Sequence, residues 1–462
     1  METLGCQMNK LDSELVAGLL AKSDYQPTSD PAEAQVAILN TCSVRDHAEQ
    51  KALSRLGHFD HLRRTSGKPE IIAIMGCFAQ RSPEYILQRV PFVDVLCGPS
   101  QIHQLPELIT TTRRDREKSK KIHTKRAVTD FRQIRSGKAS PADDLENLDL
   151  CRPVEETQFQ RFVRVQRGCD KFCSYCVVPF VRGPESSRPV DHILEEVRRI
   201  DQTGCKEITL IGQTISSYRF VSDGQTVDLP ELLYRVHQAC SIPRIRFITS
   251  YPADFSLNIF KAIAELRRIC PYLHLPAQHG SNRVLQLMNR KYAVETYLEI
   301  LEQGRRIVPG LSVAGDFIVG FPTETDQDHN HSITLLENVR YKNCFIFKYS
   351  VRPGTLAEKR FTDDVSDEIK SRRHRQMLEV QDRISREDNQ SLVGKTVDVL
   401  VEGISKKNRS NQENVKQLVG RTVEDKIVIF EGPETLKGEI ERVKITAVSS
   451  LTLFAERCNG RN

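Results

Sequence analysis

The sequence predicts an α/β protein in three parts: an open, Rossmann-like α/β domain, a partial (β/α)6 barrel and a small all-β barrel. Three observations predict this order. Continuous apolar runs alternate with helical patterns over the first hundred residues, and strand–helix units repeat from residue 159 to about residue 390. After about residue 391, short segments with period-two character stand between glycine or polar turns.

Length and composition fit a globular protein of several domains. A chain of 462 residues suggests roughly three domains, and 39% hydrophobic with 28% charged residues is ordinary for such a protein. No apolar stretch reaches the roughly 18 residues of a transmembrane helix. The start has no basic region followed by an apolar one, so we expect no secretory signal. Thirteen unevenly spaced cysteines favour reduced thiols over disulfides, and we expect a cytoplasmic location.

In the first domain, three cysteines follow predicted strands. The apolar runs 35–40, 71–76 and 93–98 are typical of strands buried on both faces of a parallel sheet. Cys42 and Cys77 come directly after the first two of these runs, and Cys6 follows a short strand of its own. The carboxyl ends of parallel strands meet at one edge, so the three thiols are predicted to converge there. The alternative is three separately buried thiols.

A charged segment separates the first two predicted domains. Residues 111–138 hold eleven Lys or Arg against three acidic residues, and the stretch after them is acidic. Such a patch binds phosphates by counterion release, or it is simply a solvated linker, and the sequence leaves both interpretations open. The predicted boundaries are 1–110 for the first domain, 111–158 for the linker, 159–390 for the central barrel and 391–458 for the last domain.

The central domain begins with a strand that leads into a cysteine-rich loop. Its six candidate strands are 161–166, 207–212, 244–249, 272–275, 312–320 and 344–350. Cys169, Cys173 and Cys176 stand as C-x3-C-x2-C on the loop after the first strand, at the end where such barrels place catalysis.

The spacing of these three cysteines favours an iron–sulfur cluster. Three thiolates from one loop can hold three irons of a [4Fe–4S] cluster and leave the fourth iron free for a small chelating molecule. Structural zinc wants four ligands, but no second cysteine pair is near and Cys205 stands alone. Buried structural thiols fit poorly with the polar residues between these cysteines.

The C-x3-C-x2-C run, with the aromatic Tyr175 before its last cysteine, resembles the signature of the radical S-adenosylmethionine (radical SAM) enzymes. The resemblance implies that the open iron is chelated by the methionine moiety, and that one electron splits the sulfonium to give a 5′-deoxyadenosyl radical. Tyr175, Gln213, Asp316 and Gly320 are candidate SAM-binding residues. Gly320 could equally belong to a plain turn.

Three other residues near these motifs have an ordinary alternative. Arg182 and Arg188 flank Gly183 just after the cysteines, where they could meet a carboxylate or phosphate or form ordinary ion pairs. His274 is predicted to be a satisfied core histidine rather than a ligand.

Further runs resemble the methylthiotransferases within this superfamily. GCQMNKLDSE, NTCSVRDHAEQKALSRLG and MGCFAQR are similar to their amino-terminal domain, which implies an auxiliary [4Fe–4S] cluster on Cys6, Cys42 and Cys77. The chain departs from the family pattern in its short start before Cys6, in His279 where serine is common, and in Val351 where proline is common.

The last domain resembles the TRAM domain, an OB-like RNA-binding module. Lys406, Lys407 and Arg409 lie on a presumptive loop suited to phosphate contacts. A run of basic residues does not by itself indicate RNA binding, but on a loop of such a barrel we expect these residues to contact RNA.

The resemblance covers nearly the whole chain and implies a reaction. Its motifs look most like the branch that replaces C2–H of isopentenyl-adenosine at tRNA position 37 with a methylthio group, using two SAM molecules and two [4Fe–4S] clusters. The flipped base is expected to pack against aromatic or apolar side chains. Expected partners are tRNA, an electron donor of flavodoxin or ferredoxin type and a sulfur source, with no membrane and a monomeric chain.

Three alternative functions stay open. Two are methylthiotransferase branches that act on threonylcarbamoyl-adenosine in tRNA or on an aspartate of a ribosomal protein. The third is a non-enzymatic iron–sulfur sensor that binds RNA, against which stands the full set of barrel motifs.

Overall fold

The computed structural model describes residues 1–43, 46–119, 126–128, 148–149, 152, 158–222, 224–248, 250–406 and 415–458. The chain divides into two compact units. Unit 1 comprises Met1–Val154, Gln166–Phe172 and Cys176–Arg188, and unit 2 comprises Glu155–Val165, Cys173–Tyr175 and Pro189–Asn462. The cysteine loop of the central domain therefore contributes residues to both units.

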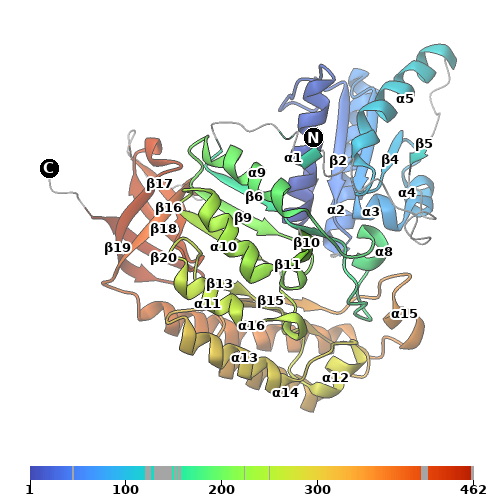
Figure 1. Ribbon diagram of the computed structural model, residues 1–462. Coiled ribbons are helices and arrows are strands. Elements are labelled where there is room, and N and C mark those ends of the chain that lie inside the picture. The colour runs from blue at the N-terminus through green and yellow to red at the C-terminus, as the bar shows by residue number, and fades with distance from the viewer. Residues whose placement is uncertain are drawn as a thin grey trace. The chain divides into compact units, whose positions relative to one another are not determined.

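Unit 1 is built on a parallel five-stranded sheet in sequential order, drawn in blue in Figure 1. Its strands are β1 (Glu2–Leu4), β2 (Val36–Thr41), β3 (Ile71–Gly76), β4 (Val95–Cys97) and β5 (Arg126–Val128). The side chains of β3 are buried throughout and those of β2 nearly so, which agrees with their continuous apolar runs.

Helices cover this sheet and confirm the open α/β class. They are α1 (Gln7–Lys22), α2 (Asp46–Ser66), α3 (Cys77–Arg81), α4 (Pro83–Arg89) and α5 (Leu105–Ser119). One core joins Leu39 and Ile74 of the sheet to Leu56 of α2, Phe78 of α3 and Ile86 of α4. Helices α1 and α5 pack against each other and against the sheet.

Helix α5 and strand β5 extend into the segment that the charge pattern marks as a linker. Thr112 of α5 is buried, and Arg116 forms an ion pair with the buried Asp94. Arg113 lies 3.7 Å from Glu70. These basic residues therefore hold the helix against the sheet domain. The rest of the basic segment lies largely outside the described residues, and the predicted domain boundaries stay a prediction.

Two short strands and a short helix of the cysteine-loop region complete unit 1. Strands β7 (Gln166–Arg167) and β8 (Ser186–Ser187) form an antiparallel pair. Between them lies the short helix α8 (Val178–Arg182), which packs against α3.

Unit 2 contains the predicted partial (β/α)6 barrel. All six predicted strands are present, as β6 (Gln160–Arg164), β9 (Glu207–Ile211), β12 (Arg244–Ile248), β13 (Tyr272–His274), β14 (Ser312–Val319) and β15 (Asn343–Lys348). They form two parallel three-stranded sheets, β12-β9-β6 and β13-β14-β15. A bridge from Ile245 to Ile269 links β12 to the turn before β13. A large apolar core unites the strands with the surrounding helices.

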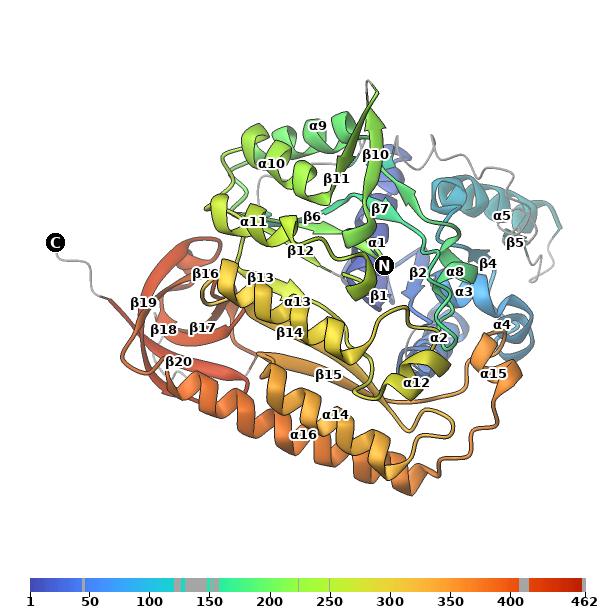
Figure 2. The same ribbon diagram turned by 60° about the horizontal axis from the view of Figure 1, so that its bottom comes forward.

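Figure 2 shows these helices along the strands. They are α9 (Val190–Asp201), α10 (Leu229–Ala239), α11 (Asn258–Glu265), α12 (Asn282–Leu287), α13 (Val294–Ile307), α14 (Asp326–Val339), α15 (Leu356–Arg360) and α16 (Asp367–Gln390). A hairpin of β10 (Arg219–Ser222) and β11 (Gln225–Asp228) precedes α10. Short 3-10 helices cover Ile102–Gln104 in unit 1 and Ile215–Ser217, Pro252–Asp254 and Glu434–Leu436 in unit 2.

The end of the chain forms the predicted small β-barrel. Strands β16 (Thr396–Ile404), β17 (Lys416–Arg421), β18 (Ile427–Gly432), β19 (Ile440–Val448) and β20 (Thr452–Arg457) close in the order β16-β17-β18-β20-β19. Alternate residues such as Val399, Leu418 and Phe430 fill its interior. The period-two pattern therefore predicted the strands and the barrel that they form.

Two arginines of β12 fasten this barrel to the central strands. Arg244 donates to the carbonyl oxygens of Arg421 and Asp398 at 2.7 and 2.9 Å. Arg246 donates to those of Val423 and Thr422 at 2.9 and 2.6 Å, and it also pairs with Glu207 at 2.9 Å. Both side chains are buried, so these bonds belong to the interior of unit 2.

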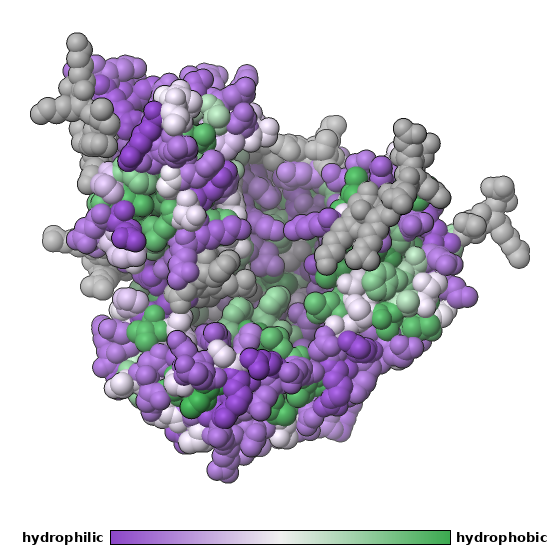
Figure 3. Space-filling model, turned by 180° about the vertical axis from the view of Figure 1, so that it is seen from behind, coloured by the Kyte–Doolittle hydropathy of each residue, from purple (hydrophilic) through white to green (hydrophobic). Residues whose placement is uncertain are grey.

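Hydrophilic side chains predominate on the face drawn in Figure 3, with apolar ones in small groups among them. Among the helices that the structure describes, none has both the length and the apolar character needed to cross a membrane.

Candidate functional site

The strands of unit 1 bring the thiols of Cys6, Cys42 and Cys77 towards one another. Cys42 follows β2, Cys77 opens α3 directly after β3, and Cys6 caps the start of α1 after β1. A hydrogen bond with Cys42 lowers the pKa of the Cys6 thiol to about 6, although burial acts in the opposite direction. Cys77 is close enough to interact electrostatically with Cys6.

A buried arginine lies beside these thiols. Arg182 of α8 donates to Asp12 Oδ2 at 2.7 Å, and both side chains are almost fully buried. Burial lowers the pKa of the Arg182 guanidinium, but Asp12, Cys77 and Cys6 outweigh burial and raise it well above the usual value. Burial raises the pKa of the Cys77 thiol, and Arg182 partly offsets that effect. The arginine therefore favours thiolates at this site.

Helix α8 also contacts the site through apolar side chains. Val177 and Val181 form a small buried cluster with Cys77. Arg182 thus forms an ion pair within the protein, which is the ordinary alternative, and Asp12 holds it next to the cysteines. Arg188 also forms an ordinary ion pair, since its Nε lies 3.7 Å from the buried carboxylate of Asp149.

The loop that carries Cys169 and Cys176 is tightly folded. Gly168 has a φ of 64°, and a Cβ at this position would lie 1.9 Å from the carbonyl oxygen of Pro184. The Cys169 amide donates to the Gly183 carbonyl at 3.2 Å, and the Val178 amide donates to Cys176 Sγ at 3.4 Å. Only glycine therefore fits directly before Cys169.

Within unit 2, a second buried arginine contacts Cys173. Arg290 donates to Cys173 Sγ at 3.3 Å and to the Pro276 carbonyl at 3.3 Å. Its guanidinium carbon lies 4.3 Å from the ring centre of Tyr251 and 5.0 Å from that of Tyr292. Aromatic faces stabilise a cation held in this way. Sequence reasoning did not single out Arg290, because nothing in the run NRKY says which residue its basic side chains meet.

No group of three or more His, Cys, Asp or Glu among the described residues is arranged around a single metal ion. A cluster of four irons does not require such an arrangement, because each thiolate binds a different iron. The donor set fits iron–sulfur clusters. Soft thiolate ligands suit iron–sulfur centres, and a buried arginine near each set can balance the negative charge of a thiolate-bound cluster.

Two unsatisfied polar atoms lie at the carboxyl ends of neighbouring barrel strands. Gln213 follows β9, and its buried Oε1 has no hydrogen-bond partner among the described residues. Ser250 follows β12, and the same holds for its Oγ within the part of the chain that the structure describes. Buried polar groups normally have partners, so these atoms fit a polar small molecule such as SAM. Sequence reasoning named Gln213 but missed Ser250.

The other candidate SAM residues occupy different surroundings. Tyr175 packs in an apolar cluster that includes Phe321 and Tyr349. Asp316 of β14 lies 3.3 Å from the mostly buried His274 of β13, so this histidine has a polar partner within the protein, as predicted.

The structure gives a packing reason for Gly320. Its φ is 70°, and a Cβ there would lie 2.3 Å from Lys370 Cγ on α16. The amide groups of Gly320 and Phe321 both donate to the buried Glu324 carboxylate. A close approach of adenine to this glycine stays a prediction.

Glu324 is the centre of a buried charged group that sequence reasoning missed. His279, the residue that departs from the family pattern, has its Nε2 at 3.7 Å from Glu324 Oε2. His329 Nδ1 lies 3.8 Å from Oε1, and Arg373 lies 3.4 Å from the same oxygen. Burial lowers the pKa of His329, whereas Glu324 raises it. Through the hydrogen bonds from Gly320 and Phe321 to Glu324, this group holds the turn after β14 in place.

Of the predicted RNA-binding loop, Lys406 is exposed, whereas Lys407 and Arg409 lie outside the described residues. RNA contact through this loop stays a prediction.

Comparison with known proteins agrees with this architecture. Residues 1–98 match an uncharacterized protein family, UPF0004, residues 163–336 match the radical SAM superfamily, and residues 390–457 match the TRAM domain. Among solved structures, the radical S-adenosylmethionine methyltransferase TsrM from Kitasatospora setae aligns with a TM-score of 0.53 at 14% identity, covering 75% of this chain and 74% of that one. This likeness concerns the fold alone.

The fold and the cysteine loop thus define a radical SAM protein. A tRNA-2-methylthio-N(6)-dimethylallyladenosine synthase of Rhodopirellula baltica is 44% identical over 98% of this chain and 94% of its own length. One from Phocaeicola vulgatus is 39% identical over 99% of this chain and 95% of its own. The chain belongs to the family of these synthases.

Proposed function

We propose that this protein converts N6-isopentenyladenosine at position 37 of tRNA to its 2-methylthio derivative. The observation that carries the proposal is the near full-length similarity to synthases named for this reaction, over all three domains. The presence of two sets of cysteines, each with a buried arginine, supports it, because the reaction needs both a radical and a sulfur donor.

Cys169, Cys173 and Cys176 hold one [4Fe–4S] cluster in this proposal, and Cys6, Cys42 and Cys77 hold the auxiliary one. When bound, the two clusters and SAM supply the electron, the radical and the methylated sulfur. Radical chemistry is needed because C2–H of adenosine is not acidic and hydride is a poor leaving group.

The protein contributes binding, orientation and charge. Arg290 donates a hydrogen bond to Cys173 Sγ and brings a positive charge to that sulfur. Arg182 brings a positive charge near the thiols of Cys6 and Cys77, with Asp12 holding its guanidinium in place. Gln213 and Ser250 offer their unsatisfied oxygens to SAM at the strand ends. The C-terminal barrel binds the tRNA, with Lys406, Lys407 and Arg409 contacting phosphates.

The reaction needs an electron donor and a source of sulfur. The electron is supplied by a small flavodoxin or ferredoxin, and the sulfur by a separate source that rebuilds the auxiliary cluster. The chain works as a monomer in the cytoplasm, where its tRNA substrate is found.

A direct assay tests this function. The protein is reconstituted anaerobically with iron and sulfide, and supplied with reductant, SAM and tRNA that carries isopentenyladenosine. Nucleosides are then analysed by mass spectrometry, and the 2-methylthio product is expected. Parallel reactions contain tRNA with threonylcarbamoyl-adenosine or the ribosomal protein with the target aspartate. Methylthiolation of either of these in place of isopentenyladenosine would contradict the proposed substrate.

A further inference from the structure

Two exposed phenylalanines of unit 1 touch each other beside the cysteine sites. Resting on the proposed function, we propose that Phe172 and Phe180 form the platform that binds the isopentenyl-adenine of the substrate tRNA. In this role they are positioning residues that select the modified base over plain adenine.

Both rings are about half exposed although they contact each other. Phe172 is 50% exposed and Phe180 is 46% exposed. Their ring centres lie 6.3 Å apart with the planes inclined at 72°, an edge-to-face geometry. Scattered exposed apolar residues are common, but a paired, exposed aromatic surface indicates a binding role.

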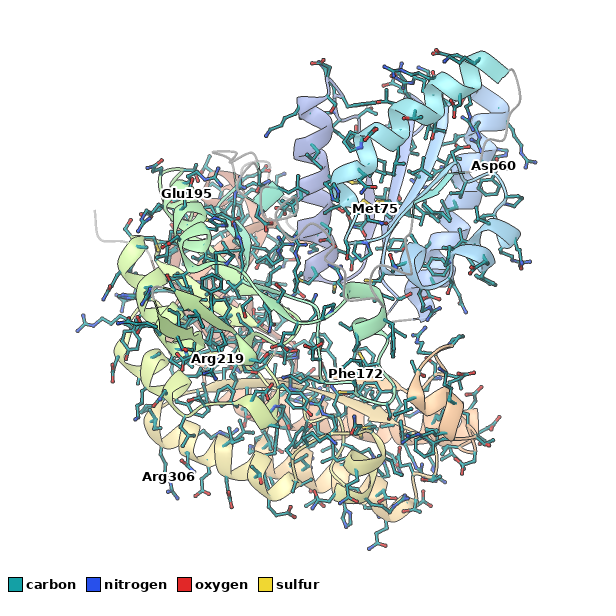
Figure 4. The ribbon with its side chains drawn as sticks, turned by 45° about the vertical axis from the view of Figure 1, so that its right-hand side comes forward. Asp60, Met75, Phe172, Glu195, Arg219 and Arg306 are labelled. Atoms are coloured by element: carbon teal, nitrogen blue, oxygen red, sulfur yellow. The ribbon has the colours of Figure 1, made fainter. Side chains whose placement is uncertain are left out.

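The backbone holds Phe172 outward at a conformational cost. Its φ is 46°, in the left-handed region that bulky residues rarely adopt. The ring gains little burial from this conformation, since half of it stays exposed. Such backbone strain tends to occur at functional positions. Figure 4 labels Phe172 on the loop that leads to α8.

The position of the pair relates it to both cysteine sets. Phe172 lies between Cys169 and Cys173 in the chain, so it belongs to the loop that carries Cys169, Cys173 and Cys176. Phe180 belongs to α8, and α8 packs against Cys77 of the other set through Val177 and Val181. The platform therefore combines the loop of one set with the helix that packs against a cysteine of the other, which suits a carbon that must meet a radical and then a sulfur.

The chemistry of the modified base matches two aromatic rings in this arrangement. A purine stacks on an aromatic face, and the branched isopentenyl chain adds an apolar group that unmodified adenine lacks. Loss of one stacking ring typically weakens single-stranded nucleic-acid binding on the order of tenfold to a hundredfold. Loss of the apolar partner of the isopentenyl chain should remove the preference for the modified base.

The test measures binding, without turnover. The reconstituted, unreduced protein is titrated with two fluorescent anticodon stem-loops that differ only in isopentenyladenosine or adenosine at position 37. We expect Phe172→Ala and Phe180→Ala each to weaken binding of the modified stem-loop about tenfold, with a much smaller effect on the unmodified one. The affinity ratio of the two RNAs then falls towards one.

Matched variants separate recognition from folding. Tyr85→Ala removes another exposed aromatic side chain of unit 1, 51% exposed on α4, and should keep the wild-type ratio. Phe172→Tyr and Phe180→Tyr keep a ring and should keep selectivity, whereas Phe180→Leu keeps bulk without a ring and should lose part of it. Iron content and the cluster absorption spectrum show whether each variant is loaded. If an alanine variant fails to load, the tyrosine variant at the same position and Phe180→Leu decide.

Two results are distinguishable. If the wild-type protein methylthiolates isopentenyladenosine while loaded Phe172 and Phe180 variants keep the wild-type affinity ratio, the platform is wrong and the proposed function stands. If the wild-type protein does not methylthiolate this tRNA and binds the two stem-loops equally, both proposals fall. An effect of Tyr85→Ala as large as that of Phe180→Ala would also overturn the platform.

Discussion

The two sets of cysteines are brought together in opposite ways. Cys6, Cys42 and Cys77 are distant in sequence and approach one another because three neighbouring parallel strands end at the same edge. Cys169, Cys173 and Cys176 are close neighbours on one loop. The first set therefore depends on the complete sheet, whereas the second depends on local spacing. A motif identifies the second set, but only topology identifies the first.

The buried arginines of the two sets also differ in how they are held. Arg182 is paired with the Asp12 carboxylate, which cancels most of its charge at longer range. Arg290 is held by the tyrosine rings and a carbonyl oxygen, none of which is negatively charged. Arg290 thus presents a full positive charge to Cys173, whereas Arg182 acts mainly through its immediate contacts.

The largest expected difference between the sets concerns the cysteines themselves. Cys173→Ala should abolish formation of 5′-deoxyadenosine, by at least about a thousandfold, because in the proposed function it removes a ligand of the cluster that cleaves SAM. Cys42→Ala should leave SAM cleavage detectable while the methylthio product disappears. Both products are quantified in one reaction by mass spectrometry. Parallel loss of cleavage and product in Cys42→Ala would show that the two sets do not divide the work in this way.

The two arginines should respond differently to replacement by methionine. Arg182→Met leaves Asp12 buried without its partner, which typically costs about 3–5 kcal/mol of stability, and Arg182→Met with Asp12→Leu should recover most of it. Arg290→Met removes a charge without stranding another. It should make the cluster at Cys173 harder to reduce, by about 59 mV for each tenfold change in the reduction equilibrium.

Denaturant unfolding measures the stability change of Arg182→Met, and a redox titration followed by electron paramagnetic resonance measures the potential change of Arg290→Met. In each redox titration the cysteines of the set that is not being measured are replaced by alanine, so that only one cluster is observed. An unchanged midpoint in Arg290→Met, or a double variant no more stable than Arg182→Met alone, would remove the contrast between the two arginines.

The smallest effect is a difference in thiol reactivity within unit 1. The hydrogen bond with Cys42 lowers the pKa of Cys6 to about 6, and Arg182 adds to this effect. Burial raises the pKa of Cys97, at the end of the neighbouring β4, to about 12. In cluster-free protein, alkylation of Cys6 should reach half its maximal rate near pH 6, whereas Cys97 should stay unreactive at neutral pH because the thiolate is the nucleophile.

The same shift makes stability depend on pH with a definite sign. Folding lowers the pKa of Cys6 from 9.0, so its ionised form stabilises the folded cluster-free protein fully above about pH 9. That contribution is lost as the pH falls through about 6. Peptide mapping by mass spectrometry gives the alkylation profile, and Cys42→Ala should move its midpoint upward. A midpoint near pH 9 in the wild-type protein would contradict the proposed contact.

The elements that the sequence predicted well are those with a strong local pattern. The runs at β2 and β3 and the six barrel strands are continuous or alternating apolar segments, and each lies within about two residues of its predicted range. The basic segment after residue 111 was harder, because α5 is held there by ion pairs such as Arg116 with Asp94. Those partners are distant in sequence and leave no periodic signal.

The residues around the cysteines were the least predictable. Arg182 and Arg290 are ordinary basic residues in the sequence, and only the folded chain shows which thiols they meet. Ser250 and Glu324 likewise acquire their significance from burial. For Gly320, the sequence suggested a functional role and the structure gives a packing reason instead. Its position after a barrel strand suggested contact with a cofactor, and the structure supplies a side chain of the protein itself, Lys370, as a reason for the glycine.

The C-terminal barrel is attached to β12 through its main chain rather than through particular side chains. Arg244 and Arg246 donate hydrogen bonds to main-chain oxygens of the barrel, which every amino acid supplies. Most side chains on the barrel surface can therefore be substituted without loss of these hydrogen bonds. A homologous barrel grafted in its place should dock without redesign of the joint. Deleting the barrel would be a less informative experiment. It would expose the guanidinium groups of Arg244 and Arg246 and the strand β12 that carries them, so a loss of activity would reflect damage to the core rather than loss of RNA binding.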